Sequence, residues 1–154
     1  MTPPVVTTIE AVRATLDTHR AAGRSVGFVP TMGSLHAGHR SLIEASVAAN
    51  AVTIVSIFVN PLQFAAGEDL ESYPRDLACD TEVCAAAGAD LIFAPSVKEM
   101  YPQPMATIVE VPSVAFPLEG RSRPEHFAGV ATVVAKLFSI VGPCRAYFGE
   151  KDWQ

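Results

Sequence analysis

The chain has few cysteines. It contains three in 154 residues, and Cys79, Cys84 and Cys144 show no Cys-x-x-Cys spacing. An odd count without that spacing indicates neither a disulfide framework nor a zinc ribbon. Because the cytoplasm keeps thiols reduced, we expect three free thiols and a cytoplasmic protein.

Positive charge and long apolar runs are also scarce. The 11 Lys and Arg residues are outnumbered by 16 Asp and Glu, for a net charge of -5. Nucleic-acid and anionic-membrane surfaces need clustered Lys and Arg, so we expect neither partner, although a local basic site for one small anion is compatible with this charge. The start of the chain lacks a basic segment followed by an apolar one, and no run approaches the length of about 18 apolar residues that a membrane span requires. We therefore expect neither secretion nor membrane insertion.

What the chain does contain is apolar residues in short blocks. Hydrophobic residues make up 49% of it, which is enough for one core in a chain of this length. Apolar residues at helical spacing predict helices over residues 8–23 and 38–50, with further helices over 76–88 and 129–142. Short apolar runs predict buried strands at 25–29, closed by Pro30, and at 51–60, 89–96 and 145–149.

The order of these elements predicts the fold class. Apolar strands alternating with helices are typical of a parallel sheet that is covered on both faces. Right-handed crossovers then give a Rossmann-like, doubly wound α/β fold, which we expect as one domain over residues 1–154. Ligands of such sheets bind beyond the carboxyl ends of the strands. Residues 30–39, 60–63 and 95–100 each follow a predicted strand, so we expect them to converge on one crevice.

Two histidines stand at a predicted junction of strand and helix, in the stretch VPTMGSLHAGHRSL. Gly33 suits a tight turn after the strand, and Gly38 allows a close approach of the backbone to a ligand. His36 and His39 then lie at the first helical turn, where unpaired N–H groups and the helix dipole favour an anion. This pattern favours a phosphate-binding site.

Two other interpretations of the histidines stay open. A zinc pair is less well supported, because the spacing is not i, i+4, no glutamate lies between the histidines and no cysteine is near. The other interpretation is that His36 and His39 only cap the helix and hold no ligand.

At this point the sequence resembles a known family. PTMGSLHAGHRSL resembles the HIGH-type signature of the nucleotidyltransferase superfamily, and in its extended form it is similar to the pantothenate synthetase family. Further segments resemble the same family in the same order and cover nearly the whole chain. They are SIFVNPLQF, YPRDL, DLIFAPSVKEMYP, RPEHFAGVATVVAKLF and YFGEKDWQ.

The resemblance implies roles for individual residues. His36, His39 and Lys151 would be catalytic, with the histidines holding the ATP phosphates as pyrophosphate leaves. Asp80 would hold Mg²⁺. The implied ATP-binding residues are Pro30, Thr31, Met32, Gly33, His36, His39, Gly149, Lys151 and Asp152. The implied pantoate-binding residues are Met32, Asn60, Gln63, Arg123 and His126.

The resemblance also implies an activity. A ligase of this family joins pantoate to β-alanine with ATP and Mg²⁺, through a pantoyl adenylate, and releases AMP and pyrophosphate. Such a reaction requires positioned reactants together with cations and N–H donors for phosphoryl charge, and the implied residues supply both. The extended segment MATIVEV is a candidate edge strand or homodimer strand, and we expect a homodimer.

Length is the main departure from the family. Its members are about twice as long and carry a smaller second domain that closes over ATP. We therefore expect an amino-terminal ATP- and pantoate-binding domain that is weakly active or inactive alone. Two rival functions stay open: a phosphopantetheine-type adenylyltransferase, and a ligand-binding or assembly domain without turnover.

Overall fold

The computed structural model describes residues 1–65, 68 and 70–154. Five parallel strands form one sheet in the order β1-β4-β3-β2-β5. The strands are β1 (Val5–Val6), β2 (Val26–Thr31), β3 (Val52–Ile57), β4 (Leu91–Phe93) and β5 (Arg145–Ala146). The helices are α1 (Ile9–Ala21), α2 (Ala37–Ala49), α3 (Leu77–Ala87), α4 (Val97–Met100), α5 (Pro112–Ala115), α6 (Glu119–Ser122) and α7 (His126–Val141), with 3-10 turns η1 (Pro61–Gln63) and η2 (Glu150–Asp152).

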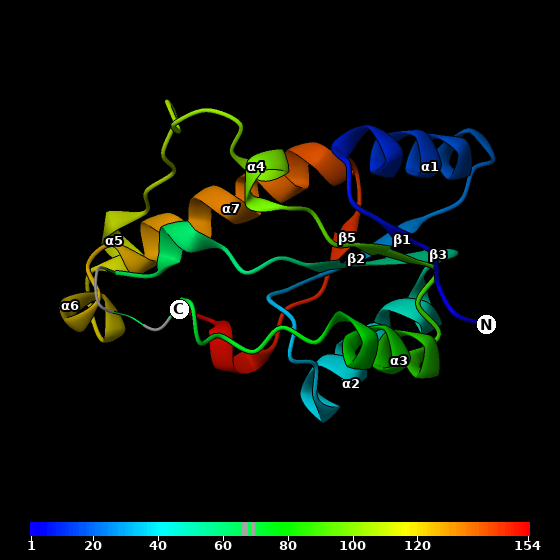
Figure 1. Cartoon of the computed structure of the whole chain (residues 1–154), viewed down its shortest axis with the longest axis horizontal. Helices are drawn as coiled ribbons and strands as arrows, with labels where there is room; N and C mark the ends of the chain where they lie inside the picture. The colour runs from blue at the N-terminus through cyan, green and yellow to red at the C-terminus, as the bar shows by residue number, and fades with distance from the viewer. Residues whose placement is uncertain (66–67, 69) are drawn as a thin grey trace.

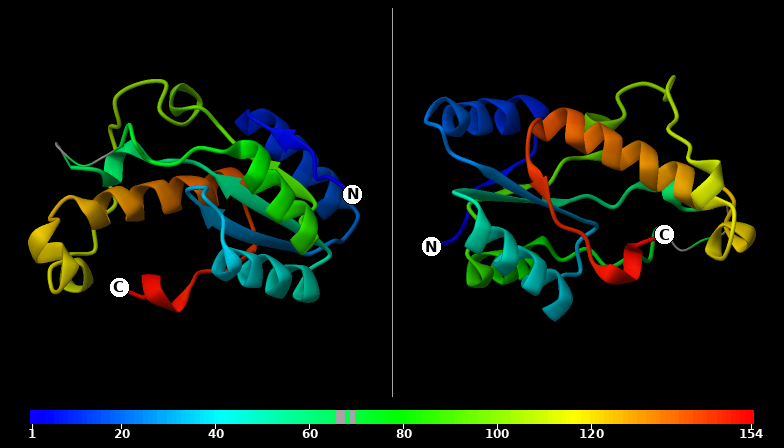
Figure 2. Two further views of the ribbon diagram at one scale, coloured as in Figure 1. Left: turned by 60° about the horizontal axis from the view of Figure 1, so that its bottom comes forward. Right: turned by 180° about the vertical axis from the view of Figure 1, so that it is seen from behind.

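Helices cover both faces of the sheet, as the sequence predicts. Figure 1 shows α1 and α7 on one side and α2 and α3 on the other, and the reverse view in Figure 2 agrees. Successive strand residues point to opposite faces. Phe28 accordingly packs in the core under α1 and α7, whereas its neighbour Val29 packs with Ile43 of α2. The sheet is therefore buried on both sides, which is the reason its strands are almost wholly apolar.

Two of the predicted helix ends are confirmed by their capping contacts, whereas α7 begins at His126, three residues before its predicted start. The side chain of Thr8 accepts a hydrogen bond from the N–H of Ala11 at the start of α1. At the end of α3, Gly88 adopts a left-handed conformation with φ 85°, which glycine enters without steric cost.

Strand β2 is longer than predicted, because it continues through Pro30 to Thr31. In a parallel ladder, residues two apart direct their backbone groups to the same neighbour. Phe28 faces β5, since its carbonyl accepts from the N–H of Tyr147. Pro30 faces the same side, where β5 has already ended at Ala146, so its missing N–H breaks no ladder hydrogen bond.

Two other expectations assigned more residues to the sheet than the structure does. The predicted strand at 145–149 pairs only at Arg145 and Ala146. The segment MATIVEV does not belong to the five-stranded sheet, and α5 begins directly after it. Within the described residues, no helix has the length and apolarity needed to cross a membrane.

The strand order indicates where a ligand site is expected. The chain passes from β2 through β3 to β4 in one direction and then returns to place β5 on the other side of β2. Ligand sites of open α/β sheets lie where the order reverses, beyond the carboxyl ends of the strands. A ligand site is therefore expected beside the segments that follow β2, β3 and β5.

Candidate functional site

The turn after β2 has an unusual backbone. Gly33 and Ser34 both have positive φ, of 83° and 53°. The Gly33 N–H donates to Oγ1 of Thr31 at 3.2 Å, and this hydroxyl donates to the Ser56 carbonyl of β3 at 2.8 Å. The turn is thus tied to the ends of two neighbouring strands. A non-glycine residue at φ 53° is strained and needs surrounding contacts to hold it there.

Asp80 supplies those contacts. Its carboxylate, 2% exposed in the first turn of α3, accepts hydrogen bonds from the N–H groups of Ser34 at 3.0 Å and Leu35 at 2.7 Å. A side chain at Gly33 would lie 2.8 Å from Oδ2 of Asp80, so only glycine fits there. Asp80 therefore anchors the turn that leads into α2.

His36 and His39 cap α2 reciprocally. Nδ1 of His36 accepts from the N–H of Gly38 at 3.1 Å, and Nδ1 of His39 accepts from the N–H of His36 at 3.4 Å. The ring centroids are 4.2 Å apart. A neutral imidazole that accepts at Nδ1 carries its proton on Nε2. Both rings therefore keep an Nε2–H donor at the positive end of a helix, a combination that suits an anion.

The surroundings of His39 favour this neutral form. Partial burial lowers the pKa of His39, and the nearby His36 and Lys151 lower it further. A cation beside an imidazole opposes its protonation, as does the loss of water. Lys151 belongs to η2, which follows β5, and β5 is the neighbour of β2, the strand that leads into α2.

The predicted ATP-binding residues lie around this point. Pro30 and Thr31 end β2, and Met32 and Gly33 form the turn. Gly149 is the N-cap of η2, and the exposed Lys151 and Asp152 form an ion pair with Nζ to Oδ1 at 2.7 Å. The η2 turn lies on the α2 side of the sheet (Figure 1).

A second group of predicted residues follows β3. Asn60 is 1% exposed and caps η1, accepting from the N–H of Leu62 at 3.3 Å. Its Nδ2 donates to Oε1 of Gln63 at 3.2 Å and to the carbonyl of Gly129 in α7 at 3.1 Å. The Asn60 side chain thus joins the end of β3, the η1 turn and α7.

Arg123 and His126 support the backbone of η1. Nδ1 of His126 lies 3.0 Å from the carbonyl oxygen of Gln63. The guanidinium of Arg123 pairs with both carboxylate oxygens of Glu68, at 2.7 and 3.0 Å. The hydrogen bond from Arg123 lowers the pKa of Glu68. In this arrangement both residues contact the protein, and their predicted role in binding pantoate stays a prediction.

Sequence reasoning missed Tyr101, which belongs to this second group. Its hydroxyl donates to Oδ1 of Asn60 at 2.7 Å. The available signal was its position, directly after the segment 95–100 that was expected at the crevice. Its distance of 41 residues along the chain from Asn60 hides the pairing.

The predicted magnesium role of Asp80 does not fit its surroundings as a direct ligand. Both of its oxygens already accept backbone hydrogen bonds, and the carboxylate is almost fully buried. Mg²⁺ keeps several waters and needs open octahedral positions. Among the described residues there is also no group of three or more His, Cys, Asp or Glu side chains that could hold a metal ion.

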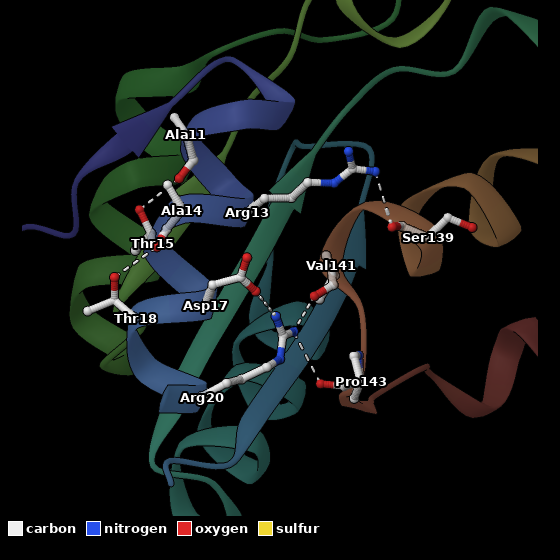
Figure 3. Close-up of polar contacts among 10 residues, drawn as sticks. All are labelled: Ala11, Arg13, Ala14, Thr15, Asp17, Thr18, Arg20, Ser139, Val141 and Pro143. Atoms are coloured by element: carbon white, nitrogen blue, oxygen red, sulfur yellow. Dashed lines mark hydrogen bonds and ion pairs between the residues drawn. The ribbon is translucent and has the colours of Figure 1, made fainter. Parts of the chain in front are cut away.

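A hollow of about 410 Å³ lies elsewhere, near the amino ends of β2 and β5, and Arg20, Arg24 and Arg145 line it. Figure 3 shows Arg20 directed at the carbonyl oxygens of Val141 and Pro143, where α7 ends. Arg145 reaches the carbonyl of Ala49 at the end of α2 at 3.4 Å. Cations at helix carboxyl ends offset the dipoles, so Arg20 and Arg145 have a structural explanation there.

The sequence and the fold both match proteins of one family. Residues 4–154 match the protein family described as pantoate-beta-alanine ligase. The pantothenate synthetase of Allorhizobium ampelinum is 62% identical over 150 residues, covering 97% of this chain and 52% of the relative. That of Sinorhizobium medicae is 60% identical over 149 residues, covering 97% of this chain and 51% of the relative. The chain spans about half the length of the curated relatives it matches.

Solved structures agree. The pantothenate synthetase of Thermus thermophilus superposes with a TM-score of 0.90 at 52% identity, covering 97% of this chain and 52% of that one. The pantoate-beta-alanine ligase of Francisella tularensis, complexed with beta-gamma ATP and beta-alanine, has a TM-score of 0.86 at 41% identity and covers 92% and 54%. Because the family match extends over nearly the whole chain, this chain belongs to the pantoate–β-alanine ligase, or pantothenate synthetase, family.

Proposed function

We propose that this chain is the ATP- and pantoate-binding amino-terminal domain of an enzyme that condenses pantoate with β-alanine. The observation that carries the proposal is the reciprocal capping of His36 and His39, which leaves two Nε2–H donors at the amino end of α2. ATP phosphates would accept hydrogen bonds from these donors. The structure of the Francisella tularensis relative, a complex with an ATP compound and β-alanine, supports the same substrates here.

The proposed reaction has two steps. A carboxylate oxygen of pantoate attacks the α-phosphorus of ATP, the bond to the bridging oxygen breaks, and pyrophosphate leaves. The amine of β-alanine then attacks the acyl carbon of the pantoyl adenylate, AMP leaves and the amine loses a proton. No step requires a covalent bond to the protein, so positioning and charge stabilisation account for the catalysis.

The roles of the first group follow from its chemistry. His36 and His39 would donate to phosphate oxygens whose negative charge grows as pyrophosphate leaves. Lys151 would add a positive charge at the same place once its ammonium leaves Asp152 for the stronger phosphate anion. Such donors stabilise the transition state more than the ground state, because the charge on the leaving oxygens increases along the reaction.

The remaining ATP contacts would come from residues 30–33, Gly149 and Asp152. The turn after β2 brings the backbone close to the start of α2, where a bulky side chain at Gly33 would not fit. Gly149 is the N-cap of η2 and Asp152 is its last residue, and the nucleotide would lie beside this turn. Backbone N–H groups in such turns are ready donors for an anionic ligand.

The second group would bind pantoate. Gln63 is half-buried at the carboxyl end of β3, and Asn60 holds its amide. We propose that Met32 supplies an apolar wall. Arg123 and His126 would act mainly by holding the η1 backbone and Glu68 in place. A role for them in direct contact with pantoate would require Arg123 to exchange Glu68 for the substrate carboxylate.

Magnesium would enter with ATP and be held mainly by phosphate oxygens and water, as is usual for nucleotide-bound Mg²⁺. Its contribution would be to neutralise phosphate charge. Asp80 would act on the site through the turn, since its oxygens accept from Ser34 and Leu35.

We also propose a homodimer in which the MATIVEV segment and the following helix take part. Ile108 is 63% exposed and Phe116 73% exposed, and Val111 and Val114 are about half exposed. Apolar residues gathered on one surface segment are typical of an interface. Sedimentation equilibrium tests this directly, with Phe116→Ser as the variant expected to dissociate the dimer.

The test of function is pyrophosphate release with Mg-ATP, with and without D-pantoate. Release that requires pantoate and disappears in the double variant His36→Ala, His39→Ala is the expected result. His19→Gln, at the far end of α1, is the control that should keep release. Release with 4′-phosphopantetheine in place of pantoate would favour an adenylyltransferase, and pantoate binding without release would favour a domain that depends on further chain for turnover.

A further inference from the structure

The side-chain amide of Asn60 uses its full hydrogen-bonding capacity. It is 1% exposed. Its Oδ1 accepts from the hydroxyl of Tyr101 at 2.7 Å and from the N–H of Leu62 at 3.3 Å. Its Nδ2 donates to the carbonyl of Gly129 at 3.1 Å and to Oε1 of Gln63 at 3.2 Å.

The two backbone partners determine which way this amide points. The carbonyl of Gly129 can only accept, and the N–H of Leu62 can only donate, so the oxygen of Asn60 has to face Leu62 and its nitrogen Gly129. Nδ2 of Asn60 then also faces Gln63. Gln63 has to present Oε1 to it, because Nε2 of Gln63 at that position would place two N–H donors against each other. The Nε2 group of Gln63 is thereby turned away from Asn60. Among the described residues it has no hydrogen-bond partner.

We propose that Tyr101 is a positioning residue whose hydroxyl, by ordering Asn60, holds Gln63 with its Nε2–H group outward as a donor to an oxygen atom of the acid substrate. This inference rests on the proposed function, in which Gln63 binds pantoate. It adds the direction of the hydrogen bond: Gln63 donates, and the substrate supplies a carboxylate or hydroxyl oxygen as acceptor. A substrate with a donor at that position would leave two N–H or O–H groups facing each other, which is costly in a half-buried site.

Tyr101 is suited to this role by its packing. Its ring contacts Phe58 edge-on at 5.9 Å between centroids, and Nζ of Lys136 lies 5.1 Å from the ring centroid. The ring is therefore held independently of its hydroxyl. Burial raises the pKa of Tyr101 to about 12, so the hydroxyl keeps its proton and remains a donor throughout the neutral pH range. Tyr101→Phe should consequently remove one hydrogen bond and leave the ring in place.

The chain offers a matched control. The hydroxyl of Tyr147 is also bonded to an asparagine side chain, accepting from Nδ2 of Asn50 at 2.8 Å. Asn50 is the C-cap of α2. Helix α2 lies on the opposite side of the sheet from α7, the helix that Asn60 contacts. Tyr147→Phe thus removes a tyrosine hydroxyl from an asparagine side chain, as Tyr101→Phe does, but without an effect on Gln63.

The first measurement needs no ligand. In ¹H–¹⁵N spectra of the ligand-free protein, Tyr101→Phe should shift the side-chain amide signals of Asn60 and Gln63 and lower the heteronuclear NOE of Gln63 Nε2. Tyr147→Phe should leave both unchanged. Unchanged Gln63 signals in Tyr101→Phe would overturn the proposal whatever the protein binds.

The second measurement is the affinity for D-pantoate by calorimetry, in a cycle with Gln63→Ala. We expect Tyr101→Phe to raise Kd roughly tenfold, which corresponds to about 1.4 kcal/mol. In the Gln63→Ala background, Tyr101→Phe should raise Kd by less than about twofold. The reason is that Tyr101 is proposed to act through Gln63 and has no separate effect once the Gln63 side chain is gone. Equal losses in both backgrounds would overturn the proposal, since Tyr101 would then act by another route.

The two measurements separate this inference from the proposed function. If the unmodified protein binds no D-pantoate but Tyr101→Phe still loosens Gln63, the positioning role stands and the assignment of pantoate fails. If pantoate binds with the same affinity to the unmodified protein and to Tyr101→Phe, the positioning role fails and the proposed function is untouched.

Discussion

Oδ1 of Asp80 accepts a 2.7 Å hydrogen bond from the backbone N–H of Leu35, a residue 45 positions earlier in the chain. The other oxygen of the same carboxylate accepts from Ser34. These two contacts hold α3 against the turn between β2 and α2, and this turn positions His36 beyond the end of β2. The carboxylate therefore acts on the histidines through the backbone.

Asp80→Asn tests this role. An amide has one oxygen, so one of the two backbone N–H groups would face the new NH₂ group and lose its acceptor. Leaving a buried donor unpaired costs about 1 to 3 kcal/mol. We expect the free energy of unfolding in urea to fall by that amount, while the Mg²⁺ concentration needed for ATP binding stays unchanged. Glu82→Gln, on the exposed side of the same helix, should stay within about 0.5 kcal/mol. A stable Asp80→Asn variant that needs far more Mg²⁺ would favour direct coordination.

The pH dependence of stability should report His39. Its pKa is lowered in the folded state, first by burial and then by His36 and Lys151. Protonation then favours the unfolded chain, so the contribution of His39 is complete above the usual histidine pKa of about 6.5 and is lost as the pH falls through the folded value. We expect His39→Gln to lose less stability than the unmodified protein between neutral and mildly acidic pH. A slope for His39→Gln identical to that of the unmodified protein would contradict the prediction.

Gly129 should not tolerate a side chain. A Cβ atom there would lie 2.3 Å from the carbonyl oxygen of Leu62 and 2.7 Å from Cα of Gln63, both backbone atoms. Neither can move without shifting η1 away from α7. We expect Gly129→Ala to lower the free energy of unfolding by about 1 to 3 kcal/mol, measured by thermal denaturation. Gly149→Ala, whose Cβ would meet only ordinary contacts at 3.9 Å, should be much less destabilising.

Arg20 should contribute to stability more than its neighbour Arg13. Figure 3 shows both side chains crossing from α1 to the end of α7. Arg20 donates to the carbonyls of Val141 and Pro143, whereas Arg13 makes one contact with the carbonyl of Ser139 at 3.4 Å. We expect Arg20→Ala to cost about 1 to 2 kcal/mol, because it leaves carbonyls at a helix end without a donor. Arg13→Ala should cost less than about 0.5 kcal/mol. Equal losses in urea denaturation would contradict this account of the arginines.

Local patterns were sufficient for most of the architecture. Thr8, Gly33 and Gly88 act on residues within a few positions of themselves, so the ends of α1 and α3 and the turn before α2 could be predicted from short segments. The position of His36 and His39 at a strand-to-helix junction could likewise be predicted from a short segment. The parallel sheet followed from apolar runs alternating with helical ones.

What the sequence by itself determined is therefore the four long helices, four of the five strands of the sheet, their order and the residue types at the ends of these strands. Only the tertiary structure decided that Asp80 holds the turn, that Arg123 pairs with Glu68 and that Tyr101 reaches Asn60. Each of these contacts joins residues more than 40 positions apart. They depend on how helices dock on the sheet, and no local period or spacing encodes which side chains then meet.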